Sequence, residues 1–553
     1  MIRSKAAVAG AVFGCLAACS AFSSDDAKPT DLGSVDDGGG ADGSRPVEGA
    51  PVAQIQLSLD LVGQLEVLRG ASASVRVTVK RLNDSSGEVL VSVGGLPKGV
   101  HADAVSIPSG ESAGSLKVVA DDTSAQGVTG ASVTGAYSTA KTLLSSPVAL
   151  SVLVRGKPGT LDETFGTQGI REASALEGLA LVDASEQPDG KIVFLARAAA
   201  EPSIRLGRLT TDGTLDSTFG TAGLVSSTLG GDVGTLSPPL SLAVEPKGEI
   251  FVAGDAIGVD GKVAIRHFTA AGAVDGAFGA AGLSFVAPPF PGFHVAAMRQ
   301  ADTGKLVIVG SGTKASAQVI ASSRMGIARL ERTGALDPAF GTAGWAIVDR
   351  SAFSGATKIE ATGLALTKDF VDAMVIASEG PPSDLRGGAA LVRFDSNASV
   401  APKATRTDVF GVTFGGLGNA ICERANGAGP ILGFSTDGAV RLFAFASDGV
   451  SRDGFDQNTL PAGSIGNIAV DALGRAIYPV NGAGVPRLAV RRNLPTGADD
   501  KTFGAAGLAQ TPASAATVVV SVVALNQRDG RVLVGGHRQV VGDNGLSFAR
   551  FWP

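Results

Sequence analysis

Residues 213–223 read GTLDSTFGTAG, and this stretch decides how most of the sequence is interpreted. The form G-x-L-D-x-x-F-G-x-x-G occurs in five clear copies, which is too often for chance. A motif that recurs roughly every sixty residues predicts a repeat architecture, here of about seven units. The other clear copies begin at Gly159, Gly272, Gly334 and Gly497, a degraded copy begins at Gly449, and an almost erased copy falls before Phe410.

Two further elements accompany each copy. A turn followed by an apolar run recurs, as in PDGKIVFLA at residues 188–196, and a short segment that usually carries Arg precedes the motif, as in GRLTTDG at residues 207–213. With the residues after the motif and an alternating apolar run, each unit offers about four short strands. Four-stranded units that repeat in this way predict a β-propeller, because radial repetition leaves few open sheet edges.

The motif carries a recurrent Asp and Phe, which we call the corner, and the strand before it carries a recurrent Arg. Repeated Asp residues could form a ring of metal ligands or acids, but a functional site is usually unique whereas a structural solution is repeated. We therefore expect each carboxylate to accept backbone N–H bonds in a turn, and each Phe to fill the core between units. These structural positions are Asp162, Phe165, Asp216, Phe219, Asp275, Phe278, Asp337, Phe340, Asp500 and Phe503, with Arg208, Arg329, Arg393, Arg492 and Arg550.

The spacing of these residues predicts an ion pair and a closed ring. Arg stands eight residues before Asp in 208/216, 329/337 and 492/500, and both partners are missing together where Ala444 and Arg452 replace them. The last strand carries Arg550 but no corner follows it, while the first corner, with Asp162, has no repeat strand before it. We therefore expect Arg550 close to Asp162, with both chain ends of the repeat region sharing one composite blade.

The repeats resemble the delta-60 repeat of bacterial surface and secreted proteins, whose hallmark includes R-[FY]-x-x-x-G-x-L-D-x-x-F-G. The resemblance covers residues 159–553 and implies a propeller-like fold with no established chemistry. It is specific in four or five units, and the fifth and sixth units depart from it.

The N-terminus predicts an exported protein. Arg3 and Lys5 precede an apolar stretch from Ala6 to Ala18 that is too short to span a bilayer, so residues 1–18 are interpreted as a signal peptide. Residues 16–19 resemble the lipobox of bacterial lipoproteins, which implies lipidation of Cys19 and, with Ser20 next, an outer-membrane or cell-surface location. Residues 19–50 are acidic and Gly-rich and form a predicted disordered tether.

Residues 51–156 carry alternating apolar residues with turns between them, the pattern of half-buried strands in a β-sandwich. The run GGLPKGVHADAVSIPSGESAGSLKVV at residues 94–119 resembles bacterial Ig-like modules. The fold class expected is all-β: an Ig-like sandwich at 51–156, followed by a seven-bladed propeller at 157–553.

Composition narrows the possible functions. A net charge of −6 with no basic run excludes a nucleic-acid footprint. The sequence holds no Cys/His cluster for zinc, no P-loop, no EF-hand loop and no nucleophile elbow, so no cofactor and no metal are expected. Cys422 is the thiol left free after signal cleavage and lipidation, and we expect it to be a buried small hydrophobe.

Two functions remain open. The first is a non-catalytic binding or scaffold protein, anchored to the membrane by lipid, whose propeller loops contact an unknown protein or glycan. The second is an enzyme that acts on polysaccharide as a hydrolase or lyase, with acids such as Asp232, Asp255 or Glu379. Two carboxylates about 5–10 Å apart at the mouth of the central channel would favour the enzyme. A closed or apolar mouth would favour binding.

Overall fold

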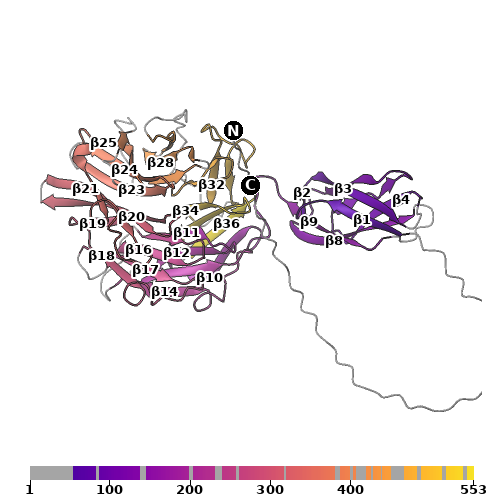
Figure 1. Ribbon diagram of the computed structural model, residues 1–553, viewed down its shortest axis with the longest axis horizontal. Coiled ribbons are helices and arrows are strands. Elements are labelled where there is room, and N and C mark those ends of the chain that lie inside the picture. Colours follow the sequence, from indigo (N-terminus) through magenta and orange to yellow (C-terminus); the bar gives the residue numbers. More distant parts are fainter. Residues whose placement is uncertain are drawn as a thin grey trace, which may run out of the picture. The chain divides into compact units, whose positions relative to one another are not determined.

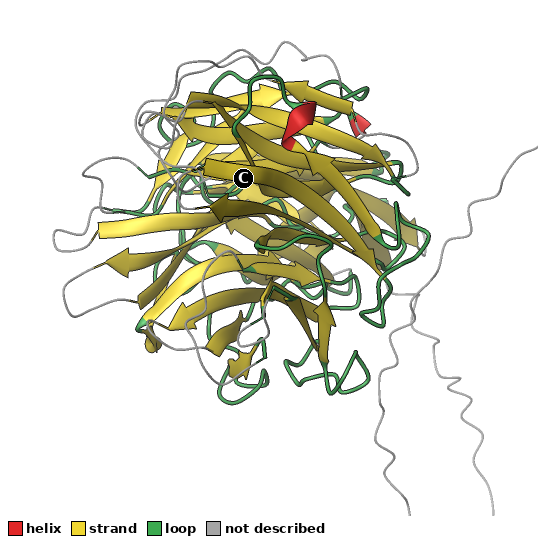
Figure 2. Ribbon diagram, turned by 90° about the vertical axis from the view of Figure 1, so that its left-hand side faces the viewer, coloured by secondary structure: helices red, strands yellow, loops and turns green. Residues whose placement is uncertain are grey.

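The computed structural model describes residues 54–553 except 83–85, 138–144, 199–202, 231–239, 257–260, 317–318, 380–385, 399–402, 407–418, 425–426, 437–438, 450–465, 482–486, 513–517 and 540–544. The predicted signal peptide, Cys19 and the tether therefore lie outside the described residues. The described elements are strands and loops with a short helical turn at Arg350–Ala352 (Figure 2). No helix among them is long and apolar enough to cross a membrane.

Residues 54–155 form two sheets around one hydrophobic core. Alternation in β3, for example, directs Val75, Val77 and Val79 inward and exposes Arg76 between them. Both sheets contribute to the core, since Val77 and Val118 of one cluster with Val67 and Val152 of the other. The first sheet has the order β1 (Gln54–Asp60), β3 (Ala71–Leu82), β7 (Ala113–Ala120), β5 (Val100–Ala102). The second has the order β2 (Leu65–Leu68), β9 (Val148–Arg155), β8 (Gly127–Tyr137), β4 (Val89–Gly94), β6 (Val105–Ile107).

Residues 170–551 form seven sheets of antiparallel neighbours, each with three or four described strands (Figure 1). The first three contain β11 (Leu179–Glu186), β12 (Ile192–Ala198), β13 (Ser203–Leu209), β14 (Leu224–Thr228); β15 (Ser241–Val244), β16 (Ile250–Asp255), β17 (Val263–Phe268), β18 (Leu283–Val286); and β19 (Phe293–Gln300), β20 (Leu306–Ser316), β21 (Val319–Leu330), β22 (Trp345–Asp349).

The next three sheets follow the same order, and the degenerate unit around residue 430 has three described strands. They contain β23 (Lys358–Leu366), β24 (Phe370–Glu379), β25 (Arg386–Asp395), β26 (Lys403–Arg406); β27 (Asn419–Glu423), β28 (Pro430–Thr436), β29 (Ala439–Ala444); and β30 (Ala469–Val470), β31 (Ala476–Pro479), β32 (Ala489–Asn493), β33 (Leu508–Gln510).

The seventh sheet joins the two ends of the repeat region. Its order is β10 (Ile170–Glu177), β36 (Gly545–Phe551), β35 (Val532–Gln539), β34 (Val518–Asn526). The magenta β10 and the yellow β36 lie side by side (Figure 1), with Ile170 opposite Ala549. Arg550 Nε donates to Asp162 Oδ2 at 2.7 Å, and the guanidinium lies over the Phe165 ring. The predicted composite sheet is therefore confirmed.

The inner strands of the seven sheets form a closed ring; the inner strand is the first of each sheet in chain order, except in the seventh sheet, where it is β34. Each of β11, β15, β19, β23, β27 and β30 contacts the next, β30 contacts β34, and β34 contacts β11. The corners repeat this closure, since Gly220 N–H donates to Ala271 O of the following unit and Gly504 N–H donates to Pro158 O near the start of the repeat region. Large apolar clusters fill the space between neighbouring sheets, as between β12 and β16.

The sequence unit and the sheet are offset by one strand. The residues after each F-G-x-x-G pair with the Arg-bearing strand before the corner, as β14 pairs with β13, and thus form the outer edge of the preceding sheet. The corner allows this reversal because its glycine is left-handed: at Gly220, φ is +55° and an added Cβ would lie 2.4 Å from Leu224 O. Glycine is the residue that tolerates both conditions.

Candidate functional site

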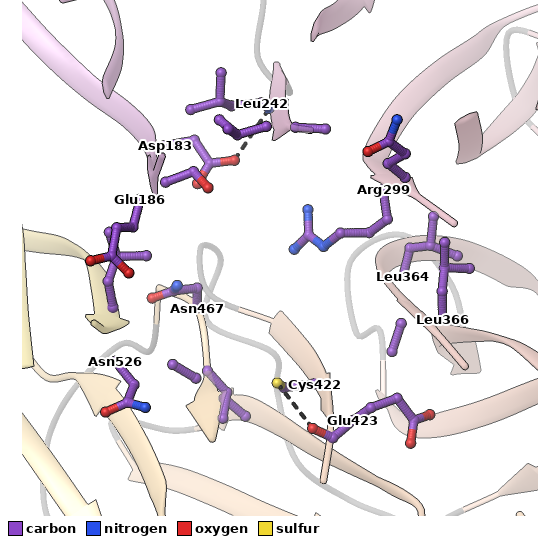
Figure 3. A pocket seen from close by; sticks show the side chains of 18 of the residues that line it. Asp183, Glu186, Leu242, Arg299, Leu364, Leu366, Cys422, Glu423, Asn467 and Asn526 are labelled. Atoms are coloured by element: carbon purple, nitrogen blue, oxygen red, sulfur yellow. Dashed lines mark hydrogen bonds between the residues drawn. The ribbon is translucent and has the colours of Figure 1, made fainter. Parts of the chain in front are cut away.

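The carboxyl ends of the seven inner strands meet at one mouth of the central channel. They enclose an open cavity of about 630 Å³, lined by residues of β11, β15, β19, β23, β27, β30 and β34 and of the turns that follow several of these strands. A cavity of this size suits a small molecule. Figure 3 shows the Arg299 guanidinium reaching into the open space, with Asp183 on one side of it and Cys422 on another. The lining also includes Glu186, Glu423 and Asn526.

Asp183 on β11 joins two neighbouring sheets. Its Oδ1 accepts from Ala184 N–H at 2.9 Å and its Oδ2 accepts from Leu242 N–H of the next sheet at 3.3 Å. Burial raises the pKa of this carboxyl, although the charge of Arg299 and these backbone bonds act in the opposite direction. Asp183 therefore holds β15 beside β11 while it faces the cavity.

Two other acids at the mouth are also held by neighbouring units. Glu186 Oε2 accepts from Arg528 N–H at 2.9 Å. Glu245 Oε1 accepts from Gln300 Nε2 at 2.5 Å, and its Oε2 lies 2.6 Å from Arg332 Nη2. Burial raises the pKa of both carboxyls. These contacts link consecutive inner turns around the mouth.

Glu423 belongs to a buried acidic pair on the other side of the cavity. Its oxygens are buried with no hydrogen-bond partner in the described structure, and Arg393 Nη2 lies 4.0 Å away. Burial, followed by the neighbouring Asp372 carboxyl, raises the pKa of Glu423 to about 8. A proton on Glu423 would allow it to donate to Asp372, which Arg393 already binds through Nε at 2.7 Å.

This pair predicts a pH dependence. The folded state keeps a proton on Glu423 up to about pH 8, while the unfolded chain releases it near pH 4.5, so the free energy of unfolding should fall as the pH rises between these values. We expect Glu423→Gln to remove about 2–4 kcal/mol of this fall. Urea unfolding at several pH values measures it. Glu360→Gln, an exposed control, should leave the wild-type dependence intact, and an unchanged dependence in Glu423→Gln would contradict the assignment.

Cys422 also lines the cavity. It is half-buried and packs against an apolar cluster that includes Ile431 and Tyr478, so the expectation of a buried small hydrophobe is met in part. Its position on the inner strand β27 thus places it both at the channel and against a core between two sheets. Burial raises the pKa of its thiol to about 11, against the lowering effect of Arg299. The thiolate, which is the nucleophilic form, is thus scarce at neutral pH.

The repeated Asp, Phe and Arg residues lie away from the cavity, at the corners between sheets. Arg208 Nε donates to Asp216 Oδ2 at 2.9 Å, and Asp216 Oδ1 accepts from Thr218 N–H at 3.0 Å. The Arg208 guanidinium lies 4.8 Å from the centre of the Phe219 ring and donates to Ala270 O of the next unit. The predicted pairing is confirmed here and at Arg329–Asp337 and Arg492–Asp500.

A second cation, at the residue after the inner turn, completes this arrangement. Asp337 lies 2.8 Å from Lys305 Nζ, and the hydrogen bonds from Lys305, Ala339 N–H and Arg329 outweigh burial and lower the pKa of Asp337 to about 2. The same second contact is made by Lys191 with Asp216, Arg475 with Asp500, and Arg531 with Asp162.

In two units, other residues form the ion pair that Arg and the corner Asp form elsewhere. His267 replaces Arg and its Nδ1 lies 2.9 Å from Asp275 Oδ2, with the ring stacked on Phe251 and beside Phe278. Arg393 has no corner Asp and binds Asp372 of the adjacent strand β24. The unit before Gly449 lacks the Arg, and its corner lies outside the described residues.

A comparison with known families supports the propeller fold. A family described as "Domain of unknown function (DUF5122) beta-propeller" matches residues 187–219 and 301–340, each from the inner turn to the corner. The chain is a β-propeller repeat protein. No curated protein matches it.

Similar solved structures are distant from this propeller. A quinonprotein alcohol dehydrogenase-like protein from Bacteroides thetaiotaomicron is 11% identical, with 82% of this chain and 96% of that chain covered and a TM-score of 0.28. A thermostable family-43 glycoside hydrolase is 11% identical, with 55% and 98% covered and a TM-score of 0.30. A nidogen/laminin complex is 6% identical, with 59% and 93% covered and a TM-score of 0.30. Scores this low carry no conclusion about function.

Of the acids proposed from the sequence for an enzyme, Asp255 does not line the propeller's cavity. Asp255 ends β16 and contacts His294 Nδ1 at 2.5 Å and Val295 N–H at 3.2 Å. Glu379 ends β24, and Asp232 lies outside the described residues. In the described part of the chain, no group of three or more His, Cys, Asp or Glu residues could hold a metal ion.

The residues that do line the mouth were missed because they are not repeated. Asp183, Arg299 and Glu423 each occur in one unit, at the end of an inner strand. Aligning the inner turns, which begin at Gln187, Glu245, Ala301 and their equivalents, would have placed these residues at the same edge of the sheets.

Proposed function

We propose that the protein is an envelope-anchored, non-catalytic binding module: an Ig-like sandwich and a seven-bladed propeller of delta-60-type repeats, tethered by lipid on Cys19. The propeller's channel mouth takes a ligand, and its turns contact a protein or glycan partner. The predicted lipobox and tether support the anchoring. The seven sheets and the closed ring of inner strands support seven blades.

The hydrogen bonds that the carboxylates at the mouth accept are the main support for this proposal. The mouth is open and polar, so neither of the two simple expectations for a binding protein, a closed or an apolar mouth, is met. Three of the lining acids, Asp183, Glu186 and Glu245, nevertheless accept hydrogen bonds from groups of neighbouring blades. A carboxylate engaged in this way positions blades and ligand rather than transferring protons.

The alternative function is a polysaccharide hydrolase or lyase. The raised pKa values of Asp183 and Glu186, and the pKa of about 8 at Glu423, favour it, because a general acid requires a carboxyl that keeps its proton at higher pH than usual.

Incubation of the detergent-solubilised full chain with acidic and neutral envelope polysaccharides separates the two functions. We expect retention of polysaccharide without new reducing or unsaturated ends. Chain cleavage that is lost in Asp183→Asn or Glu186→Gln would contradict the binding function and support the enzyme.

The anchor has its own test. Cys19→Ser should leave an unlipidated precursor and move the chain out of the membrane fraction. Normal processing and membrane partition of this variant would show that Cys19 is not the anchor.

A further inference from the structure

One charged residue stands at a position of the channel mouth where the other six inner strands carry neutral residues. Each inner strand has one cavity-lining residue two positions before its turn, and the turns at Gln187, Glu245, Ala301, Asp471 and Gln527 share the same backbone hydrogen bonds. Six of these seven positions hold small or apolar residues, and the seventh holds a guanidinium. The seven are Ser185, Ala243, Arg299, Ala365, Cys422, Ala469 and Leu525.

The Arg299 guanidinium lies outside direct ion-pair contact, although its charge acts to lower the pKa of the nearby Asp183. Its Nη1 donates to Met298 O at 2.9 Å, and no described carboxylate lies within ion-pair distance of it. The side chain is exposed, and its guanidinium reaches into the open space between Asp183 and Cys422 (Figure 3). The repeated Arg residues at the corners, by contrast, are each paired with an Asp. An unpaired guanidinium that points into a cavity is suited to bind an anionic group, which it contacts through two parallel N–H bonds.

The surroundings restrict the charge of that anion. Asp183, Glu186, Glu245 and Asp302 line the same cavity, as does Glu423, which is protonated below about pH 8, and Arg528 is the other cation among the described lining residues. A doubly charged phosphate would be repelled by these acids, whereas one guanidinium offsets the single charge of a carboxylate.

The rest of the lining indicates a hydroxylated ligand. Ser185 and Asn526 offer a hydroxyl and an amide with no hydrogen-bond partner among the described residues, and the cavity of about 630 Å³ has room for a molecule much larger than an ion. Hydroxyl groups both donate and accept, so they suit a mixed lining of carboxyl, amide and hydroxyl groups.

We propose that Arg299 binds the carboxylate of a small hydroxylated acid of the sugar-acid class, held at the mouth of the propeller channel. This inference rests on the proposed binding function and names its ligand class.

Calorimetric titration of the detergent-solubilised full chain tests this proposal with three probes that share the same sugar ring: D-glucuronate, D-glucose and D-glucose 6-phosphate. We expect D-glucuronate to bind about tenfold more tightly than the other two. Arg299→Met, which keeps the apolar stem, should lose this preference, and Arg299→Lys should keep part of it. Arg324→Met is the matched control, because Arg324 is an exposed arginine on β21 of the same sheet, paired with Asp349 and outside the cavity.

Several results would overturn the inference. These are no binding of D-glucuronate by the wild type, equal binding of the acid and the neutral sugar, tighter binding of the phosphate, or unchanged binding in Arg299→Met. Equal melting temperatures of the variants exclude a folding defect. Polysaccharide retention and cleavage are measured on the same samples. If D-glucuronate does not bind but polysaccharide is retained without cleavage, only the ligand class proposed here is wrong and the binding function stands. If polysaccharide is cleaved, both the binding function and the ligand class are wrong.

Discussion

A chain that ends at residue 544 is expected not to unfold cooperatively. It lacks β36, which pairs with β10 on one side and β35 on the other. Truncating one buried aromatic costs about 3–5 kcal/mol, and β36 carries the buried Phe548 and Phe551. Two such losses, together with an open ring, approach the whole stability of a typical domain, about 5–15 kcal/mol.

Urea unfolding followed by circular dichroism measures this effect. A deletion of equal length within residues 20–50 is the control and should keep the wild-type transition. A truncated chain with the wild-type midpoint would show that β36 does not close the ring.

Asp162→Ala is expected to destabilise the protein by about 3–5 kcal/mol, because it leaves buried charges without a partner. Asp162 is fully buried and lies 2.7 Å from Arg550 Nε and 3.0 Å from Arg531 Nε. Its Oδ1 also accepts from Thr164 N–H at 3.1 Å.

The matched control for this substitution is Asp529→Ala, which removes an exposed partner of the same Arg531. Exposed pairs contribute about 0–1 kcal/mol, so this variant should unfold near the wild-type urea midpoint. In Asp162→Ala/Arg550→Met the loss should be smaller than the sum of the single losses, since no buried guanidinium remains at position 550. Equal effects of Asp162→Ala and Asp529→Ala would contradict the buried ion pair.

The sequence predicted the fold wherever a residue type recurs. Asp162, Arg550 and Phe165 could be placed together from the sequence alone, because each chain end holds the element that the other lacks. The pairing of Arg393 with Asp372 could not, since the acid comes from an adjacent strand and leaves no constant spacing. The offset between sequence unit and sheet was missed for a related reason. The chain reverses direction at the corner, and this reversal decides which strand the outer strand pairs with. Alternating apolar residues indicate a strand but not its partner.

The candidate site was less predictable than the fold. Asp255 and Glu379 were singled out as acids on non-repeated segments, but both end strands other than the inner ones. In the sequence the inner strands are ordinary apolar segments, and Arg299 within VAAMRQ belongs to no recognisable motif. Its significance depends on six neutral equivalents in other units, which only the closed ring brings together.

The alkylation rate of Cys422 tests directly whether the ligand binds in the channel mouth. Cys422 lines the cavity, and its thiol pKa of about 11 makes the reaction slow enough near pH 9 to follow by mass spectrometry of the peptide that contains it. We expect saturating D-glucuronate to slow this alkylation severalfold and D-glucose to leave it unchanged. A ligand that binds while the rate at Cys422 stays the same would place the binding site elsewhere on the protein and contradict a site at the channel mouth.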